Sequence, residues 1–293
     1  MQYISLPNSR NFCQNLNTFE AKVSRFSDGE TSLSLDGFDF SSKNICLVQS
    51  LFGTDSALIE LILLIDTISR NTSVLPNILL TYFSYARQDR EISPTSPISA
   101  LVIAQLISSQ KIKSVTIVDL HSPQVQGFFN QPCFNISLED FFISHILHNF
   151  DAQNIVICAA DIGGAKTARK ISEKIGCGSA IVEKMRPKAG ISFAMSLVGD
   201  VNGKICILID DIIDSAGTLC NASDMLMQNG ANSVIAYASH GIFSGSAFEK
   251  IENSAIAKIF VSNTIFENSV GKIQKLDVSQ FVIEKFEDRV RNF

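Results

Sequence analysis

The chain has 293 residues, of which 46% are hydrophobic, and its 24 Lys and Arg against 29 Asp and Glu give a formal net charge of −5. That length and apolar content are enough for two medium-sized domains with cores of their own. The negative balance argues against a general nucleic-acid binder, because affinity for a phosphate backbone comes from clustered Lys and Arg.

The cysteines and the apolar runs indicate a cytoplasmic protein. The seven cysteines form no CxxC pair, and several lie in apolar, strand-like segments, so we expect reduced core thiols. The segment MQYISLPNSR lacks the layout of a signal peptide, and apolar runs such as Leu61–Ile65 are far too short to span a membrane. We therefore expect no membrane partner and no nucleic-acid partner.

Along the chain, apolar β-branched runs alternate with segments of helical spacing. We expect strands at 45–49, 78–82, 115–119, 155–159, 180–183, 205–210, 234–238 and 259–262. We expect helices at 57–68, 97–109, 138–149, 164–175, 217–230, 247–253 and 278–291. Repeated strand–helix units predict an α/β fold with mainly parallel sheets flanked by helices.

A polar stretch at 130–137 precedes the predicted helix 138–149, and we place a domain boundary there. The first domain is expected to comprise 1–138 and to be completed by the amphipathic C-terminal helix, 279–293. The second domain is expected to comprise 139–278.

The most informative segment is KICILIDDIIDSAGTL, in which an apolar strand leads through paired aspartates to a small-residue turn and a helix. Asp210 and Asp211 repel each other unless a cation or good donors, such as ribose hydroxyls, lie between them. A turn at a helix N-terminus, here 214–218, presents backbone N–H groups that suit a phosphate. A sugar phosphate fits both halves, and an ordinary strand end with a helix cap is the alternative.

This segment resembles the PRPP-binding motif that type I phosphoribosyltransferases and PRPP synthetases share. VDLHSPQVQGFF at 118–129 resembles the DLHSxQxQGFF signature of ribose-phosphate diphosphokinases, and YFSYARQDR, RFSDGE, AADIGGAKTARK and VEKMRPKAG match the same family. The resemblance covers nearly the whole chain in order. It implies two tandem phosphoribosyltransferase-like domains, with ATP on the N-terminal side and ribose 5-phosphate on the C-terminal side. The implied reaction moves the β,γ-diphosphate of MgATP to O1 of ribose 5-phosphate, giving PRPP and AMP.

The resemblance also implies roles for individual residues. Those expected to bind ATP are Phe26, Asp28, Glu30, Arg87, Gln88, Asp89 and His121. Those expected to bind ribose 5-phosphate are Asp210, Asp211, Asp214, Ser215, Ala216, Gly217 and Thr218. Lys184 and Arg186 are expected to be catalytic, by neutralising charge on the transferred group. The expected ligands of the Mg²⁺ cofactor are His121, Asp161 and Asp210, and Asp161 is the better direct ligand because magnesium prefers carboxylate oxygens.

Taken alone, some of these segments have ordinary explanations. SDGE at 27–30 is a good β-turn, Lys-x-Arg is usually a solvated turn, and a lone His is more often structural. In the resembled family, the residues matching Phe26, Asp28 and Glu30 approach the adenine of a neighbouring subunit. The resemblance therefore implies a homo-oligomer built from dimers, with the ATP site at a subunit interface.

The chain departs from regulated members of that family where they bind activating phosphate and inhibitory ADP. The substituted positions, which in those members carry mostly Lys and Arg, are Ser41, Ser42, Pro94, Thr95, Ser96 and Phe134. An anion site without arginines binds phosphate weakly, so we expect no strong allosteric control.

Two other functions share part of the pattern. A catalytically inactive, synthetase-like regulatory subunit should have a degraded catalytic loop, whereas Lys184, Arg186 and the 210–218 segment are intact. A phosphoribosyltransferase acting on a base would share the PRPP motif, but it would have no reason to carry RQDR, DLHS and two tandem domains. The sequence therefore favours the active synthetase.

Overall fold

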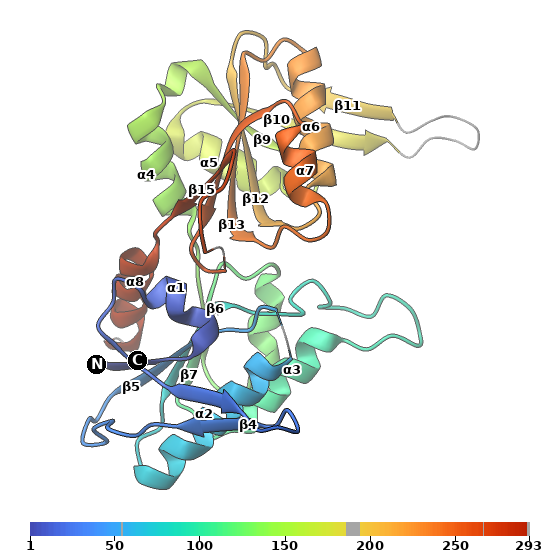
Figure 1. Ribbon diagram of the computed structural model, residues 1–293. Coiled ribbons are helices and arrows are strands. Elements are labelled where there is room, and N and C mark those ends of the chain that lie inside the picture. Colours follow the sequence, from blue (N-terminus) through green and yellow to red (C-terminus); the bar gives the residue numbers. More distant parts are fainter. Residues whose placement is uncertain (54, 186–193, 266, 292–293) are drawn as a thin grey trace. The chain divides into compact units, whose positions relative to one another are not determined.

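The computed structural model describes residues 1–53, 55–185, 194–265 and 267–291. They form two compact units (Figure 1). Unit 1 comprises Met1–Ser137, Asn263–Ile265 and Asp277–Phe293, and unit 2 comprises Leu138–Ser262 and Phe266–Leu276. Each unit is built on a mainly parallel sheet flanked by helices, which confirms the predicted fold class. None of the helices in the described part of the chain is long and apolar enough to cross a membrane.

Unit 1 has a six-stranded parallel sheet and a separate antiparallel hairpin. In spatial order the sheet strands are β2 (Thr18–Glu20), β1 (Gln2–Ser5), β5 (Ile45–Ser50), β6 (Asn77–Tyr82), β7 (Ser114–Val118) and β8 (Cys133–Ile136). The hairpin strands are β3 (Lys22–Arg25) and β4 (Thr31–Ser34). The helices are α1 (Arg10–Cys13), α2 (Ser56–Asn71), α3 (Ser99–Ser108) and α8 (Ser279–Arg291), with short 3₁₀ helices η1 (Pro7–Ser9) and η2 (Pro123–Phe128).

The two faces of this sheet are covered by different helices, because successive strand residues point to opposite faces. On one face, strand residues such as Leu47 share a core with Leu61 of α2 and Ala104 of α3. On the other face, the fully buried Phe286 of α8 packs against Tyr3, with 6.4 Å between ring centroids. The C-terminal helix is therefore part of the core of unit 1.

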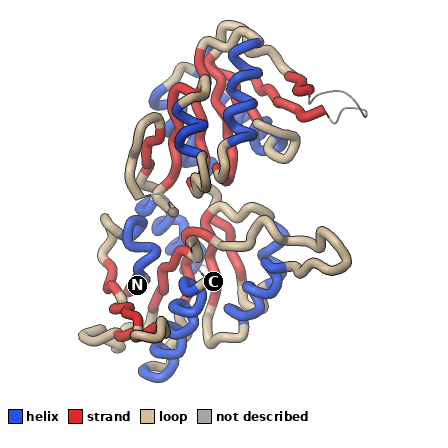
Figure 2. Tube along the Cα trace, turned by 45° about the vertical axis from the view of Figure 1, so that its right-hand side comes forward, coloured by secondary structure: helices blue, strands red, loops and turns tan. Residues whose placement is uncertain are grey.

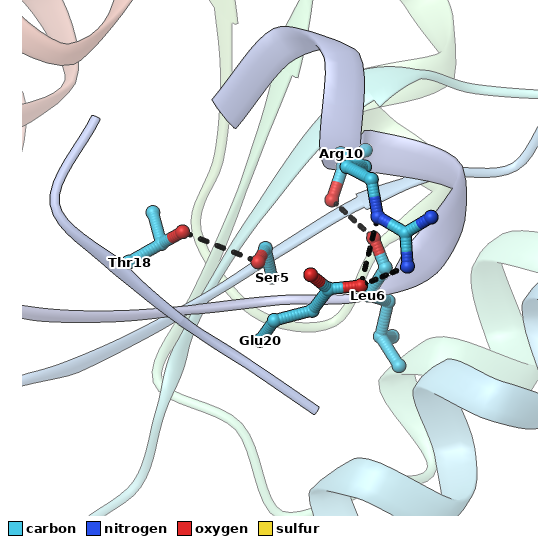
Figure 3. A network of polar contacts seen from close by, with 6 residues as sticks. Ser5, Leu6, Arg10, Thr18 and Glu20 are labelled. Atoms are coloured by element: carbon cyan, nitrogen blue, oxygen red, sulfur yellow. Dashed lines mark hydrogen bonds and ion pairs between the residues drawn. The ribbon is translucent and has the colours of Figure 1, made fainter. Parts of the chain in front are cut away.

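A polar network ties the outer strand β2 and helix α1 to β1 (Figure 3). The hydroxyls of Ser5 and Thr18 lie 3.2 Å apart, and Arg10 Nε donates to Glu20 Oε1 at 2.9 Å. A strand of three residues makes few ladder hydrogen bonds, so these side-chain contacts help to hold β2 in register.

Unit 2 has a seven-stranded sheet. In spatial order its strands are β11 (Ala194–Val198), β10 (Gly178–Met185), β9 (Ile155–Ala159), β12 (Ile205–Ile213), β13 (Ser233–Gly241), β14 (Ile256–Ser262) and β15 (Ile273–Leu276). Among these neighbouring pairs, β10–β11 is antiparallel and the others are parallel. The helices are α4 (Glu139–Asn149), α5 (Ala165–Ile175), α6 (Gly217–Gln228) and α7 (Ala247–Glu252), with the 3₁₀ helix η3 (Ala152–Asn154).

Helices cover both faces of the unit 2 sheet, as the blue tubes flanking the red strands show (Figure 2). Leu208 of β12 shares a core with Leu226 of α6 on one face. Tyr237 of β13 packs against Phe142 of α4 on the other, with 5.6 Å between ring centroids. A sheet buried on both faces explains why its strands appear in the sequence as continuous apolar runs.

Every predicted strand and helix is present, with bounds that differ by a few residues. The sequence did not predict the short strands β1, β2, β8, β11 and β15, and it ended strand β12 too early. The polar stretch 130–137 contains strand β8, which pairs with β7 at the edge of the sheet and is only half-buried. Strand β12 does not end at Asp210 but continues to Ile213, because it remains paired with β13 up to Gly241.

Candidate active site

In unit 2, three predicted site residues lie near the carboxyl ends of two neighbouring parallel strands. Asp161 follows β9, while Asp210 and Asp211 lie in the last part of β12. Burial, together with the negative charges of Asp211 and Asp161, raises the pKa of Asp210 to about 8. The fold therefore crowds three carboxyl groups into a partly buried place, which favours binding of a cation or of hydrogen-bond donors.

Backbone groups orient two of these carboxylates. The N–H of Asp211 donates to Asp210 Oδ1 at 2.9 Å, and the N–H of Gly164 donates to Asp161 Oδ1 at 3.2 Å. A Cβ at Gly163 would lie 3.1 Å from Asp161 Oδ1, so a side chain there would crowd the carboxylate. The Gly-Gly turn after β9 thus keeps the approach to Asp161 open.

The segment predicted to hold the phosphate forms a turn between β12 and α6. Ala216 precedes the helix with a left-handed backbone (φ 59°), which is uncommon for a residue other than glycine. The first N–H groups of a helix have no partner within it and carry the positive end of its dipole. The structure therefore gathers Asp214, Ser215, Ala216, Gly217 and Thr218 at a helix N-terminus suited to an anion.

In unit 1, the predicted residues Arg87 and Gln88 line a pocket of 240 Å³ at the carboxyl ends of β5 and β6. Tyr85, another lining residue, has a left-handed backbone (φ 62°), and its hydroxyl donates to Asp55 Oδ1 at 2.6 Å. Ser99 Oγ at the start of α3 donates to Gln88 Oε1 at 2.7 Å. These bonds fix the conformation of the loop that carries the predicted ATP-binding residues.

His121 comes from the next strand of the same sheet. It lies three residues after the end of β7, is exposed, and follows Asp119, which has φ 43°. Asn135 of β8 accepts a hydrogen bond from the N–H of Leu120 at 2.9 Å and so supports this turn. His121 therefore stands at the same sheet edge as Arg87, because β6 and β7 are parallel neighbours.

The tip of the β3–β4 hairpin carries the remaining predicted ATP-binding residues. Phe26 is 59% exposed, and Asp28 and Glu30 are also exposed. An ion pair of 2.7 Å between Arg25 and the buried Glu60 of α2 anchors the hairpin to unit 1. An exposed phenylalanine on an anchored hairpin is available for contact with another molecule.

The two predicted catalytic residues were both expected after a strand. Lys184 instead lies within β10, which extends to Met185 because it pairs with β11, and Lys184 stands opposite Met195. Arg186 lies outside the described residues.

Two stretches of the chain match models of known protein families. Residues 9–110 match the N-terminal domain of ribose phosphate pyrophosphokinase, and residues 182–292 match the phosphoribosyl synthetase-associated domain. The ribose-phosphate pyrophosphokinase of Rhizobium meliloti (strain 1021) is 39% identical over 252 residues, which cover 86% of this chain and 81% of that protein. The chain belongs to the ribose-phosphate pyrophosphokinase family. This confirms the family resemblance inferred from the sequence motifs.

Other members of the ribose-phosphate pyrophosphokinase family support the same assignment. The enzyme of Aquifex aeolicus (strain VF5) is 37% identical over 268 residues, covering 90% of this chain and 86% of that protein. The crystal structure of phosphoribosylpyrophosphate synthetase from Mycobacterium smegmatis superimposes with a TM-score of 0.88 over the full length of both chains, at 24% identity. At that identity the superposition establishes the shared fold.

Sequence reasoning missed several residues that support the loops of this family member. Asp55 and Tyr85 brace the loop that carries the predicted ATP-binding residues, and Ser244 donates to Asp214 Oδ1 in the turn before α6. Ser244 belongs to the segment SHGIFSGSAFEKI at the end of β13, in which the sequence predicted no site residue. These contacts join residues 30 positions apart in the chain, so their role depends on which strands are neighbours.

Magnesium requires oxygen ligands in a nearly octahedral arrangement. No group of three or more His, Cys, Asp and Glu side chains in the described part of the chain forms a metal cage. Magnesium bound with a nucleotide normally takes one or two carboxylates, and phosphate oxygens and water complete its coordination. The crowded Asp161 and Asp210 fit that pattern of partial coordination.

Proposed function

We propose that this protein transfers the β,γ-diphosphate of MgATP to O1 of ribose 5-phosphate, giving PRPP and AMP. One observation carries the proposal: in a member of this family, crowded carboxylates and a helix N-terminus suited to an anion lie at the carboxyl ends of β9 and β12. A sugar phosphate has the matching chemistry, with hydroxyl donors at one end and a phosphate at the other. An inactive regulatory subunit is not favoured, because the relatives are named as pyrophosphokinases.

Unit 2 is proposed as the sugar-phosphate side. The turn 214–218 would bind the 5-phosphate through backbone N–H groups and the hydroxyls of Ser215 and Thr218. Asp210 and Asp211 would accept hydrogen bonds from the 2- and 3-hydroxyls. The raised pKa of Asp210 supports this role, because donors that replace water around a carboxylate lower the cost of its ionisation.

Unit 1 is proposed as the nucleotide side, with Arg87, Gln88, Asp89 and His121 binding ATP. Guanidinium groups pair with phosphate and stack on purines, which suits the pocket at the ends of β5 and β6. Phe26, Asp28 and Glu30 would complete the nucleotide site of a neighbouring copy, in a homo-oligomer built from dimers. The exposure of Phe26 at the hairpin tip supports that assignment.

Magnesium, when bound, would neutralise charge on the triphosphate, and His121, Asp161 and Asp210 are the residues proposed to hold it. Lys184 and Arg186 would face the transferred diphosphate and neutralise the charge that develops on it. No side chain needs to act as a general base, because positioning and charge neutralisation supply most of the acceleration in such transfers.

Weak allosteric control by phosphate and ADP is proposed as well. The hydroxyl of Ser41 donates to Asp39 Oδ2 at 2.8 Å, and that of Ser42 donates to the carbonyl of Asn44 at 3.1 Å, so both serve local turns. Turnover should therefore change little when millimolar phosphate is added. The proposed compartment is the cytoplasm, where the seven free cysteines would stay reduced.

The deciding experiment mixes pure protein with MgATP and ribose 5-phosphate and measures AMP and PRPP together. The expected result is their formation in equal amounts. Lys184→Ala should depress turnover far more than the affinity for ribose 5-phosphate. Formation of AMP without PRPP, or equal loss of turnover and affinity in the variant, would contradict the proposal.

A further inference from the structure

The loop after β13, residues 242–246, is bonded to the turn after β12 at successive positions. The N–H groups of Ile242 and Phe243 donate to the carbonyl of Ile213 at 2.8 and 3.2 Å. The N–H of Ser244 donates to the carbonyl of Asp214 at 3.2 Å, and the hydroxyl of Ser244 donates to Asp214 Oδ1. The pairing of the two strands therefore continues beyond their ends and into the proposed phosphate-binding turn.

A third carbonyl of the turn is held from the same side. Lys250 of α7 donates from Nζ to the carbonyl of Ser215 at 3.3 Å. The carbonyls of Ile213, Asp214 and Ser215 are thus all directed toward the β13–α7 segment. In a strand successive carbonyls alternate in direction, so the chain has left strand geometry here, and the left-handed Ala216 that follows leads it into α6.

Because the peptide bond is planar, these carbonyl contacts also determine the direction in which the N–H groups point. In a trans peptide the carbonyl oxygen and the following N–H point in opposite directions. Because three successive carbonyls point to β13 and α7, the N–H groups of residues 214, 215 and 216 point to the opposite side. Successive N–H groups with a common direction form a concave anion-binding nest.

The loop 242–246 is also fixed by the packing of Phe243. Phe243 has a left-handed backbone (φ 52°), is 6% exposed, and packs against Phe248 with 5.3 Å between ring centroids. A Cβ at Gly241 would lie 2.4 Å from the Phe243 ring, so no larger residue fits there without moving the ring. The anchored ring keeps Ser244 beside Asp214.

We infer that Ser244 is a positioning residue for the sugar-phosphate turn, and that Lys250 assists it. The inference rests on the proposed function and adds a residue outside the motif 210–218. A carboxylate repels a phosphate that lies beside it. The Ser244 hydroxyl holds the Asp214 carboxylate on the β13 side, away from the N–H groups of the turn. Ser244 acts through the turn and does not need to touch the substrate.

The test compares Ser244→Ala with Ser244→Thr, which keeps the hydroxyl, and with Ser246→Ala as a matched control. Ser246 lies in the same loop, is exposed, and makes no side-chain capping bond at the start of α7. Calorimetric titration with ribose 5-phosphate measures binding independently of turnover, and KM for MgATP is measured in parallel. Thermal unfolding of each variant checks that it remains folded.

Ser244→Ala should weaken ribose 5-phosphate binding roughly 5- to 10-fold with KM for MgATP unchanged, since one hydrogen bond to a charged group is lost. Ser244→Thr should restore binding, Ser246→Ala should match wild type, and Lys250→Met should weaken binding in the same direction. If wild type binds ribose 5-phosphate and Ser244→Ala equals it, or if both substrates weaken equally, the positioning role is wrong while the proposed function stands. If wild type binds no ribose 5-phosphate, both are wrong.

Discussion

Tyr85 and Ala216 occupy corresponding places in the two units. Each is the third residue after a buried parallel strand, β6 or β12, and each has a left-handed backbone, with φ 62° and 59°. Each also lies in the loop that carries the proposed ligand-binding residues of its unit. A left-handed residue other than glycine costs about 1–3 kcal/mol, so such residues are retained where the surrounding contacts determine them.

At Ala216 the left-handed backbone tolerates a small residue and not a β-branched one. Ala216→Val should lower the free energy of unfolding by about 1–3 kcal/mol and abolish ribose 5-phosphate binding, because Ala216 is 5% exposed and φ 59° crowds a branched side chain. Ala216→Gly should keep binding. Urea unfolding and calorimetric titration measure the two effects, and equal behaviour of the two variants would contradict the role given to this turn.

Tyr85→Phe removes the hydroxyl that donates to Asp55 at 2.6 Å and leaves the ring in place. The loop carrying Arg87 and Gln88 should become less ordered, so KM for MgATP should rise roughly 3- to 10-fold while KM for ribose 5-phosphate stays constant. Asp55→Asn retains an acceptor oxygen and should have the smaller effect. Steady-state kinetics with each substrate varied in turn decides this, and a parallel rise in both KM values would count against it.

Phe286→Ala should destabilise unit 1, because α8 closes one face of its sheet. The ring is 0% exposed, and removal of a buried phenylalanine costs about 3–5 kcal/mol. Leu147→Ala on α4, where the side chain is 47% exposed, is the control and should have little effect. Chemical unfolding measures both; similar stabilities would mean that α8 contributes little to the core.

Asp210 predicts a dependence of stability on pH in the protein without ligands. Its pKa rises on folding from 3.8 to about 8, so the folded state favours the neutral acid. Its contribution to stability is therefore fully present below about pH 3.8 and is lost as the pH rises toward 8. Asp210→Asn should thus be more stable than wild type at pH 8, and the difference should shrink at pH 4. Urea unfolding at both pH values tests this prediction. A difference in stability that does not change with pH would show that folding does not raise the pKa of Asp210.

Local patterns in the sequence predicted every long element, because strands buried on both faces appear as continuous apolar runs. They missed the short strands β1, β2, β8, β11 and β15; β8, for example, is a half-buried edge strand with mixed composition. The predicted strand 205–210 is shorter than β12, and the predicted strand 180–183 ends before Lys184, which lies within β10. In each case pairing with a neighbouring strand extends the strand. Pairing between strands distant in the chain leaves little trace in local composition.

The sequence by itself determined the family, the α/β class and the residue types of both proposed ligand sites, because motifs such as DLHS and DDIIDSAGT are contiguous and carry their chemistry locally. Tertiary structure alone decided which residues hold those motifs in shape. Ser244 meets Asp214, and Tyr85 meets Asp55, because parallel strands bring the ends of distant segments to one edge of a sheet. The direction of a carbonyl or an N–H group follows from these contacts, and no local pattern encodes it.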